Sequence, residues 1–294
     1  MSSVSAVRRV AASAAVGDSM RTCGSAEQGG AGRTLAWAIA ASTLHRIRRG
    51  EGALLAVNLS LIAWHGDALA ASGLWQALVS ALAIFVMYAF NDLHDAPVDG
   101  CNPKKDRVLV RVRVAHRRTG VTATSWLGIA TLVIAAVTLG AKAAAAAAAV
   151  MVVNAAYSTR LKGVPVADVV AVWAWGALYA AIVAPPFPFV FLIGVMTGIC
   201  HLFQTLDDRA ADAASGIATT AVRSSTLPRS VLAALTLVLF GSLHGLLGAA
   251  AAVTAVVPLA IYFAVADAGA GWLLVKAYFA AVWLALLGFV RAAG

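Results

Sequence analysis

Four side chains with oxygen atoms follow a long apolar run, in the stretch NDLHDAPVD. They are Asn91, Asp92, Asp95 and Asp99. If the preceding apolar helix continues past Asn91, spacings of three and four residues place these side chains along one stripe. Carboxylates in such a stripe repel one another unless a hard divalent cation lies between them, and oxygen ligands of this kind suit Mg²⁺. The stretch therefore predicts one half of a magnesium site.

A second acidic stretch, DDRAADAASG, follows a later apolar run. Asp208 and Asp212 are four residues apart and Gly216 is four further on, so the two carboxylates share a helix face. Asp207 points about 100° away on a helix and is interpreted as a solvated neighbour. Carboxylates close to apolar segments are costly to bury without a partner, and such clusters are typical of functional sites.

Basic residues accompany both acidic stretches. Lys104, Lys105 and Arg107 follow the first, and Arg160 and Lys162 lie between the two. Acids that hold a metal, together with bases that bind phosphate, favour a diphosphate whose charge is stabilised as it leaves. A divalent-cation transporter would instead need acids at mid-membrane depth, without cations beside them. The pattern therefore favours an enzyme over a transporter.

The elements that carry these residues are apolar and long. Of 294 residues, 61% are hydrophobic and 12% are charged, and runs of about 20 apolar residues can span a bilayer. The sequence predicts an all-α integral membrane protein, a bundle of nine transmembrane helices. The expected spans are 52–72, 74–91, 121–140, 142–157, 165–184, 186–206, 230–248, 249–266 and 270–290.

The distribution of Lys and Arg gives the expected orientation. With the N-terminus in the cytoplasm, nineteen of the 22 basic residues fall in segments on the cytoplasmic side, as the positive-inside rule requires. Both acidic stretches then lie at cytoplasmic helix ends. We expect a multi-pass protein whose active site faces the cytoplasm, in a bacterial inner membrane, and the net charge of +9 needs no nucleic-acid partner.

The first 35 residues are rich in Ser, Ala and Gly, and their composition predicts a disordered cytoplasmic tail. Residues 36–294 are expected to form one transmembrane domain. Three Cys residues stand far apart without a CxxC pattern, so neither a disulfide framework nor a zinc site is indicated.

Four features together carry a resemblance to a known family. They are NDLHDAPVD followed by NPKKDR, YSTRLKG at 157–163, DRAADAASGIATTAV at 208–222, and the nine-helix count. In this order they are similar to the signatures of the UbiA superfamily of intramembrane prenyltransferases. The resemblance covers the chain from about residue 45 onward.

The resemblance implies a helical bundle around a lipid-open cavity, with the two aspartate motifs facing each other at its cytoplasmic end. It implies that Mg²⁺ and the diphosphate are held by Asn91, Asp95, Asp208 and Asp212, with Asp92 and Asp99 in support. It further implies roles in substrate binding for Arg107, Tyr157, Lys162, Arg49 and Asn58. Lys104 and Lys105 are expected to bind substrate as well, because they are among the basic residues nearest the first acidic stretch.

The implied reaction is Mg²⁺-dependent transfer of a prenyl group from a polyprenyl diphosphate, with release of diphosphate. The acceptor is expected to be aromatic or another small lipid-phase nucleophile. Two alternatives use the same clamp: a terpene cyclase without an acceptor, and phosphoribosyl transfer onto a polyprenyl phosphate. The chain has DRVLVRVRV where members acting on aromatic acceptors often show R-P-L-x-x-G, so the motifs leave the acceptor open.

Three further residues carry expectations from their surroundings in the sequence. Asp168 begins the fifth span and is expected to pair with Lys162 or Arg160. His201 lies beside the second acidic stretch and is interpreted as hydrogen-bonded rather than catalytic. Lys276 lies within the ninth span and is expected to extend toward the cytoplasmic face.

Overall fold

The computed structural model of the protein describes residues 34–48, 50–64, 69–100, 102 and 105–293, with side chains up to residue 289. These residues form helices and connecting turns and no β-strand. The expected tail at 1–35 lies almost entirely outside the described residues, as do Arg49 and Lys104.

Six helices are long and apolar enough to cross a membrane. They are α4 (Ala71–Asp99), α6 (Arg117–Leu139), α7 (Ala141–Ala156, extended to Leu161 by a π-helical turn), α9 (Phe187–Asp207), α12 (Leu227–Leu247) and α15 (Ala268–Ala293). Helices suit this environment because they satisfy every backbone hydrogen bond within the segment. The structure supports the all-helical membrane class, with six of the nine expected spans reaching full length.

The other three apolar segments are shorter than a full span. They are α3 (Ala53–Trp64), α8 (Ala167–Ala180, continued by a 3₁₀ turn to Val183) and the pair α13 (Ala249–Ala252) and α14 (Val257–Ala264). α3 packs against α4 and α8. The described residues therefore contain six apolar helices long enough to cross a membrane and three shorter apolar helical segments.

α4 is longer than the apolar run in the sequence. It contains 29 residues, about 43 Å at 1.5 Å per residue, and it continues through Pro97 to Asp99. Because a bilayer core is about 30 Å thick, one end of α4 must extend beyond the hydrocarbon. The first acidic stretch is therefore the last two turns of a helix and not a loop that follows it.

Small residues set the closest contact in the bundle. α8 and α9 share the largest helix contact, and a Cβ atom added at Gly176 would lie 2.3 Å from Oγ1 of Thr197. Such close approach of two backbones is typical of membrane helices, which associate through packing at small residues. The contact fixes α9, and with it the second acidic stretch.

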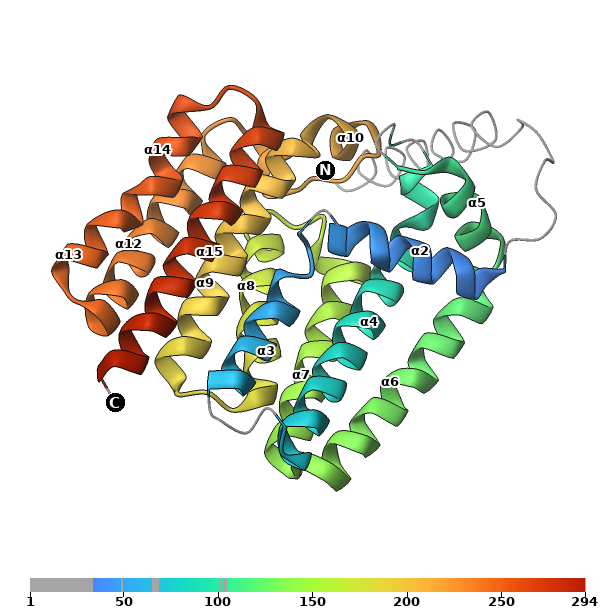
Figure 1. Ribbon diagram of the computed structural model, residues 1–294. Helices are drawn as coiled ribbons and strands as arrows, with labels where there is room; N and C mark the ends of the chain where they lie inside the picture. Colours follow the sequence, from blue (N-terminus) through green and yellow to red (C-terminus); the bar gives the residue numbers. More distant parts are fainter. Residues whose placement is uncertain (1–33, 49, 65–68, 101, 103–104, 294) are drawn as a thin grey trace, which may run out of the picture.

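Three short helices gather at one end of the bundle (Figure 1). They are α2 (Leu35–Arg48), α5 (Arg107–Ala115) and α10 (Arg209–Ala214). α2 contacts α4 and α5, so residues from before the first apolar helix lie beside the acidic end of α4.

Candidate active site

A cavity of about 290 Å³ opens into the bundle, and residues of both acidic stretches line it. Its polar part contains Asn91, Asp95, Asp99, Lys105, Lys162, Asp208 and Asp212. Its other walls are largely apolar and include the aromatic side chains of Tyr88, Tyr157, Trp175, Trp272, Phe279 and Trp283. Asp95 and Asp212 are thus 117 positions apart in the sequence but line the same cavity, which has a polar part and an apolar part.

On α4, the polar face is held by neighbouring side chains. The amide of Asn91 donates to Oδ2 of Asp95 at 3.2 Å, and Ser158 donates to Oδ1 of Asn91 at 3.1 Å. Asp99 lies one turn further along, and its Oδ2 accepts no hydrogen bond from the described residues, although Nζ of Lys105 lies 3.6 Å away. This carboxylate oxygen is buried, and a cation or a water ligand of a cation would satisfy it.

A π-helical turn, Tyr157–Leu161, directly precedes Lys162, which lines the cavity. π-helical turns inside α-helices are frequent at functional sites. Nζ of Lys162 donates to Oδ2 of Asp95 at 2.7 Å. Burial lowers the pKa of Lys162, but attraction to Asp95 outweighs it and raises that pKa above its usual value, so the side chain is a permanent cation.

The second acidic stretch turns sharply at its first carboxylate. α9 ends at Asp207, Asp208 begins the turn, and α10 carries Asp212 one turn further on. Gly216 then adopts a φ of +72°, a conformation open to glycine and costly for other residues. The backbone therefore turns back toward α10, and the N–H of Ile217 donates to the carbonyl of Asp212 at 2.9 Å.

Asp212 has an unusual proton affinity. Burial raises its pKa to about 6, with Asp208 and Asp95 adding to the increase and Lys162 opposing it. Neighbouring carboxylates raise the pKa of a carboxyl group, and a cation bound beside it would lower that pKa and restore the ionised form. Perturbed pKa values of this kind cluster at functional sites.

Asp168, on α8, is hydrogen-bonded to the segment that follows the second acidic stretch. It accepts a hydrogen bond from the backbone N–H of Thr220 at 2.8 Å and another from the Thr220 hydroxyl. Among the described residues Asp168 forms no ion pair with Lys162 or Arg160, contrary to expectation, because Thr220 satisfies its carboxylate and Lys162 pairs with Asp95. The backbone N–H of Val166, at a φ of +69°, donates to the same hydroxyl at 2.7 Å.

Asp92 lies outside the cavity, contrary to its expected supporting role at the metal. Its carboxylate accepts from Nε of Arg46 at 3.0 Å and pairs with Nη1 of Arg113 at 3.0 Å. Ser42 donates to it as well. The partners come from α2 and α5, so Asp92 joins these two short helices to α4 while Asp95 faces the cavity.

Two other predicted residues also lie away from the cavity lining. Asn58 is fully buried, and its amide donates to Ser80 and to the carbonyl of Tyr179, each at 3.1 Å. Its role is therefore to connect α3 with α4 and α8. Arg107 is the exposed first residue of α5.

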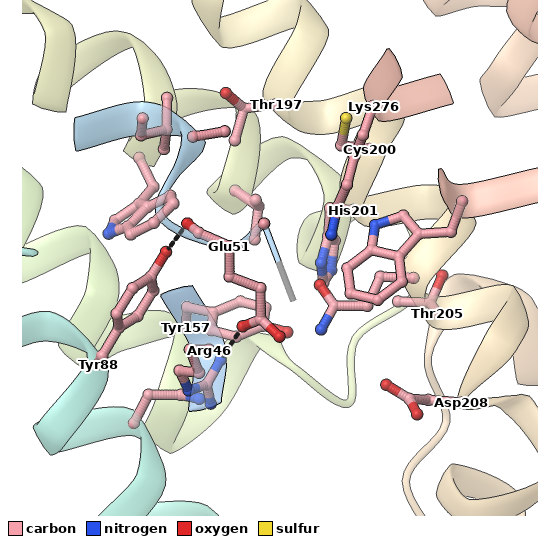
Figure 2. A pocket seen from close by; sticks show the side chains of 18 of the residues that line it. Arg46, Glu51, Tyr88, Tyr157, Thr197, Cys200, His201, Thr205, Asp208 and Lys276 are labelled. Carbon is pink, nitrogen blue, oxygen red and sulfur yellow. Dashed lines mark hydrogen bonds and ion pairs between the residues drawn. The ribbon is translucent and has the colours of Figure 1, made fainter. Parts of the chain in front are cut away.

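Three charged residues that the sequence patterns did not assign to the site line the cavity: Arg46, Glu51 and Lys276. Arg46 pairs with Glu51, and its guanidinium lies 5.1 Å from the ring centroid of Tyr88. Tyr88 in turn donates to the carbonyl of Glu51. Figure 2 shows this group on one side of the pocket and Lys276, Cys200 and His201 on the other. His201 is buried, with its ring edge-on to Tyr157.

The donor set fits Mg²⁺ that shares its coordination with a ligand. Within the described part of the chain, no three Asp, Glu, His or Cys side chains are close enough together to hold a metal by themselves. Asn91 and Asp95 on α4, Asp208 in the turn after α9 and Asp212 on α10 instead line one cavity. Mg²⁺ characteristically binds through one or two carboxylates, retained waters and substrate phosphates, which matches this arrangement.

Two solved structures share this fold. A UbiA homologue from Archaeoglobus fulgidus, bound to DMAPP and Mg²⁺, is 17% identical and covers 82% of this chain and 97% of its own, with a TM-score of 0.55. The same kind of homologue bound to GPP and Mg²⁺ is 15% identical, covers 80% and 99%, and has a TM-score of 0.51. No curated protein sequence matches the chain.

The sequence profile of the UbiA prenyltransferase family matches residues 53–293. That range contains all the described acidic residues of the cavity except Glu51. Together with the six long apolar helices, this match indicates a multi-pass membrane protein. The chain belongs to the UbiA prenyltransferase family.

Proposed function

We propose that the protein transfers a prenyl group from a prenyl diphosphate to an acceptor in a Mg²⁺-dependent reaction that releases diphosphate. The observation that supports this most strongly is the division of the cavity. Asp95, Asp208, Asp212 and Lys162 line one part, and apolar side chains, several of them aromatic, line much of the rest. A prenyl diphosphate has the same division between a charged head and an apolar chain. The ligands named for the two similar structures, DMAPP and GPP with Mg²⁺, are of this class.

The polar residues have separate roles in this proposal. Asn91, Asp95, Asp208 and Asp212 hold the metal, with Asp99 behind them. Bound Mg²⁺ supplies positive charge that stabilises the leaving diphosphate. Lys162 and Lys105 bind diphosphate oxygens, and Tyr157 lines the same cavity.

Transfer requires one bond to break and one to form. The bond between C1 of the prenyl chain and the diphosphate oxygen breaks, and its electron pair leaves with the diphosphate. A nucleophilic atom of the acceptor donates an electron pair to C1, and the proton that the acceptor loses passes to a diphosphate oxygen. Aromatic rings such as Trp175 and Tyr157 stabilise positive charge on the allyl group and exclude water from it.

The proposal includes an orientation in the membrane. Residues 36–294 form one domain of nine helical segments, the N-terminus is cytoplasmic, and the acidic end of α4 faces the cytoplasm of a bacterial inner membrane. The positive-inside rule supports this orientation, since α5 and the start of α6 carry Arg107, Arg111, Arg117 and Arg118. Water-soluble diphosphate then leaves on the side where cells use it.

The test is a product assay with purified protein in lipid nanodiscs. Allylic diphosphates of increasing chain length are supplied with Mg²⁺, and with EDTA as the control, and organic products are identified by mass spectrometry. The proposal expects Mg²⁺-dependent diphosphate release and prenylated acceptors. A cyclised hydrocarbon formed without an acceptor would indicate a terpene cyclase, and consumption of a phosphoribosyl diphosphate would indicate phosphoribosyl transfer.

A further inference from the structure

The apolar part of the cavity ends at three aromatic rings from three helices. Trp283 is the last described residue of α15 that lines the cavity. Phe189 on α9 meets the Trp283 ring edge-on, with 6.2 Å between centroids, and Trp64 on α3 stacks on Phe189 at 5.8 Å. Neither Phe189 nor Trp64 is among the described residues that line the cavity. These three side chains, here called the aromatic plug, therefore form packed core beyond the apolar end.

A hydrogen bond fixes the Trp283 ring between two helices. Nε1 of Trp283 donates to Oγ of Ser60 on α3 at 2.9 Å, and Ser60 in turn donates to the carbonyl of Val57 at 2.7 Å. A buried indole N–H needs such a partner, and edge-to-face contact between rings adds to the packing. Trp283 and Phe189 are both buried. The aromatic plug is therefore a fixed wall of the cavity and not a mobile side chain.

The depth of the cavity follows from the residues of α9 and its end that line it. They run from Asp208 at the acidic end to Ile193 at the apolar end, and these 15 positions correspond to about 22 Å at 1.5 Å per residue. Figure 2 shows Thr197 on the opposite side of the pocket from Asp208. Phe189, which meets Trp283, lies one turn beyond Ile193. The aromatic plug therefore lies about 22 Å from the second acidic stretch.

A prenyl chain must fit between the diphosphate and the aromatic plug. A diphosphate and its Mg²⁺ ion take up about 7 Å of the depth, which leaves about 15 Å. One isoprene unit is four bonds long and extends about 5 Å, so about three units fill the remaining depth. The volume gives a similar limit. A cavity of about 150 Å³ holds one benzene molecule, and the volume of about 290 Å³ corresponds to about two such molecules, or about twelve carbon atoms.

We propose that the aromatic plug limits the donor to short prenyl diphosphates, of at most three isoprene units, and that Trp283 sets this limit. This inference rests on the proposed prenyl transfer and names the class of its first substrate. The last isoprene unit of the longest donor lies against the ring of Trp283, and a fourth unit would require that ring to move. Trp283 is a specificity residue in this account and has no part in holding Mg²⁺ or the diphosphate.

The test measures binding over a series of donor lengths and needs no acceptor. Unreactive prenyl thiolodiphosphates with one to six isoprene units compete with a radiolabelled geranyl analogue for the protein in lipid nanodiscs, with Mg²⁺ present and with EDTA as the control. We expect the Mg²⁺-dependent affinity to rise up to three units, because each unit buries more apolar surface. At four units it should fall about tenfold or more, because the added unit overpacks the closed end.

Variants assign the limit to the residue. For Trp283→Ala we expect the affinity for the four-unit analogue, relative to that for the three-unit analogue, to rise about tenfold or more. This ratio separates specificity from folding, because a loss of folding weakens both affinities. Trp283→Leu leaves a smaller gap and should raise the same ratio less, and it replaces the Ala variant if that protein does not fold. Trp283→Phe keeps a ring and should keep the limit.

The matched control is Trp126→Ala. Trp126 lies on α6 with 67% of its surface exposed, and it is not among the residues that line the cavity. This variant loses an indole from a membrane-spanning helix, as Trp283→Ala does, and should bind the series of analogues as the unchanged protein does.

Two outcomes would overturn the inference. The first is equal or tighter binding of analogues with four or more units, which would show that long chains pass between the helices into the bilayer. The second is an unchanged affinity ratio in folded Trp283→Ala or Trp283→Leu protein. If no analogue binds in the presence of Mg²⁺, the proposed function itself fails. If analogues of every length bind alike, only the limit set by Trp283 fails.

Discussion

Nζ of Lys162 lies 2.7 Å from Oδ2 of Asp95, and this ion pair joins the π-helical turn after α7 to the acidic end of α4. The pair puts a cation and a carboxylate side by side at the cavity. In the proposed reaction Asp95 would bind the metal and Lys162 would bind the diphosphate. Breaking the pair should therefore affect the binding of substrate before it affects the fold.

For Lys162→Met we predict a rise of about tenfold or more in the KM of the prenyl diphosphate, since one charge-assisted contact to the diphosphate is lost. The Mg²⁺ concentration for half-maximal activity should change little or fall, because Asp95 loses a competing cation. Steady-state kinetics over a range of donor and Mg²⁺ concentrations measure both. An unchanged KM of the donor would show that Lys162 does not bind diphosphate.

Asp92 and Asp95 should give opposite phenotypes although they are three residues apart. Asp92→Asn removes a buried carboxylate between Arg46 and Arg113, and breaking such a pair costs about 3–5 kcal/mol. We predict a lower thermal unfolding temperature and protease cleavage in α2 or α5. Asp95→Asn should leave the unfolding temperature near that of the unchanged protein and remove activity.

Asp106→Asn is the control for the Asp92 variant. Asp106 caps α5 by accepting from the backbone N–H of Val108 at 2.8 Å, and Asn caps a helix about as well. This variant should keep both stability and activity. A stable Asp92→Asn protein that has lost Mg²⁺ affinity would place Asp92 at the metal and contradict the structural account.

The pH dependence of Mg²⁺ binding should report on Asp212. Burial, with Asp208 and Asp95, raises the pKa of Asp212 to about 6, so the metal-free group is ionised above that pH and protonated below it. A metal needs the ionised form, and its affinity should fall about tenfold per pH unit below pH 6. Calorimetric titration of Mg²⁺ with an unreactive diphosphate analogue, between pH 5 and pH 8, measures the midpoint. In Asp212→Asn the affinity should be lower and this dependence absent, whereas a midpoint near pH 4 in the unchanged protein would contradict the assignment.

The contact between α8 and α9 gives a prediction about stability. A Cβ at Gly176 would lie 2.6 Å from Cβ of Thr197, and overpacking of this kind costs about 1–3 kcal/mol. We predict that Gly176→Ala lowers the unfolding temperature and that a second change, Thr197→Gly, restores part of the loss. Gly241→Ala, where the added Cβ meets nothing within 4 Å, is the control and should be neutral or stabilising. Equal effects of the two glycine changes would contradict the packing described here.

Much of the site could be predicted because its residues differ in polarity from the apolar helices around them. The spacing of Asp95, Asp208 and Asp212 was sufficient to predict oxygen ligands for Mg²⁺, whereas the cavity was implied by the family resemblance. The structure brings all three to one space. The membrane-spanning helices could also be predicted from the sequence, because hydropathy alone identifies such helices.

The direction in which the Asp92 side chain points could not be predicted from the sequence. It lies on the same helix as Asp95, and its orientation follows from Arg46 and Arg113, which approach from α2 and α5. No local pattern in the sequence indicates which carboxylate a distant arginine will reach. The same holds for Asp168, whose partner Thr220 is 52 residues away, and for Lys276, whose position beside Trp272 and Gly50 depends on how α15 packs.

The most direct test of the central claim is the rate of Mg²⁺-dependent diphosphate release by Asp95→Asn and Asp208→Asn, measured beside Asp267→Asn. Asp267 caps the start of α15 by accepting from the backbone N–H of Ala270 at 2.6 Å, so its change to Asn controls for the loss of one surface charge. The account predicts that both cavity variants fold, by unfolding temperature, and lose at least about 100-fold in rate, while Asp267→Asn retains full activity. Diphosphate release at the normal rate in either folded cavity variant would contradict the account.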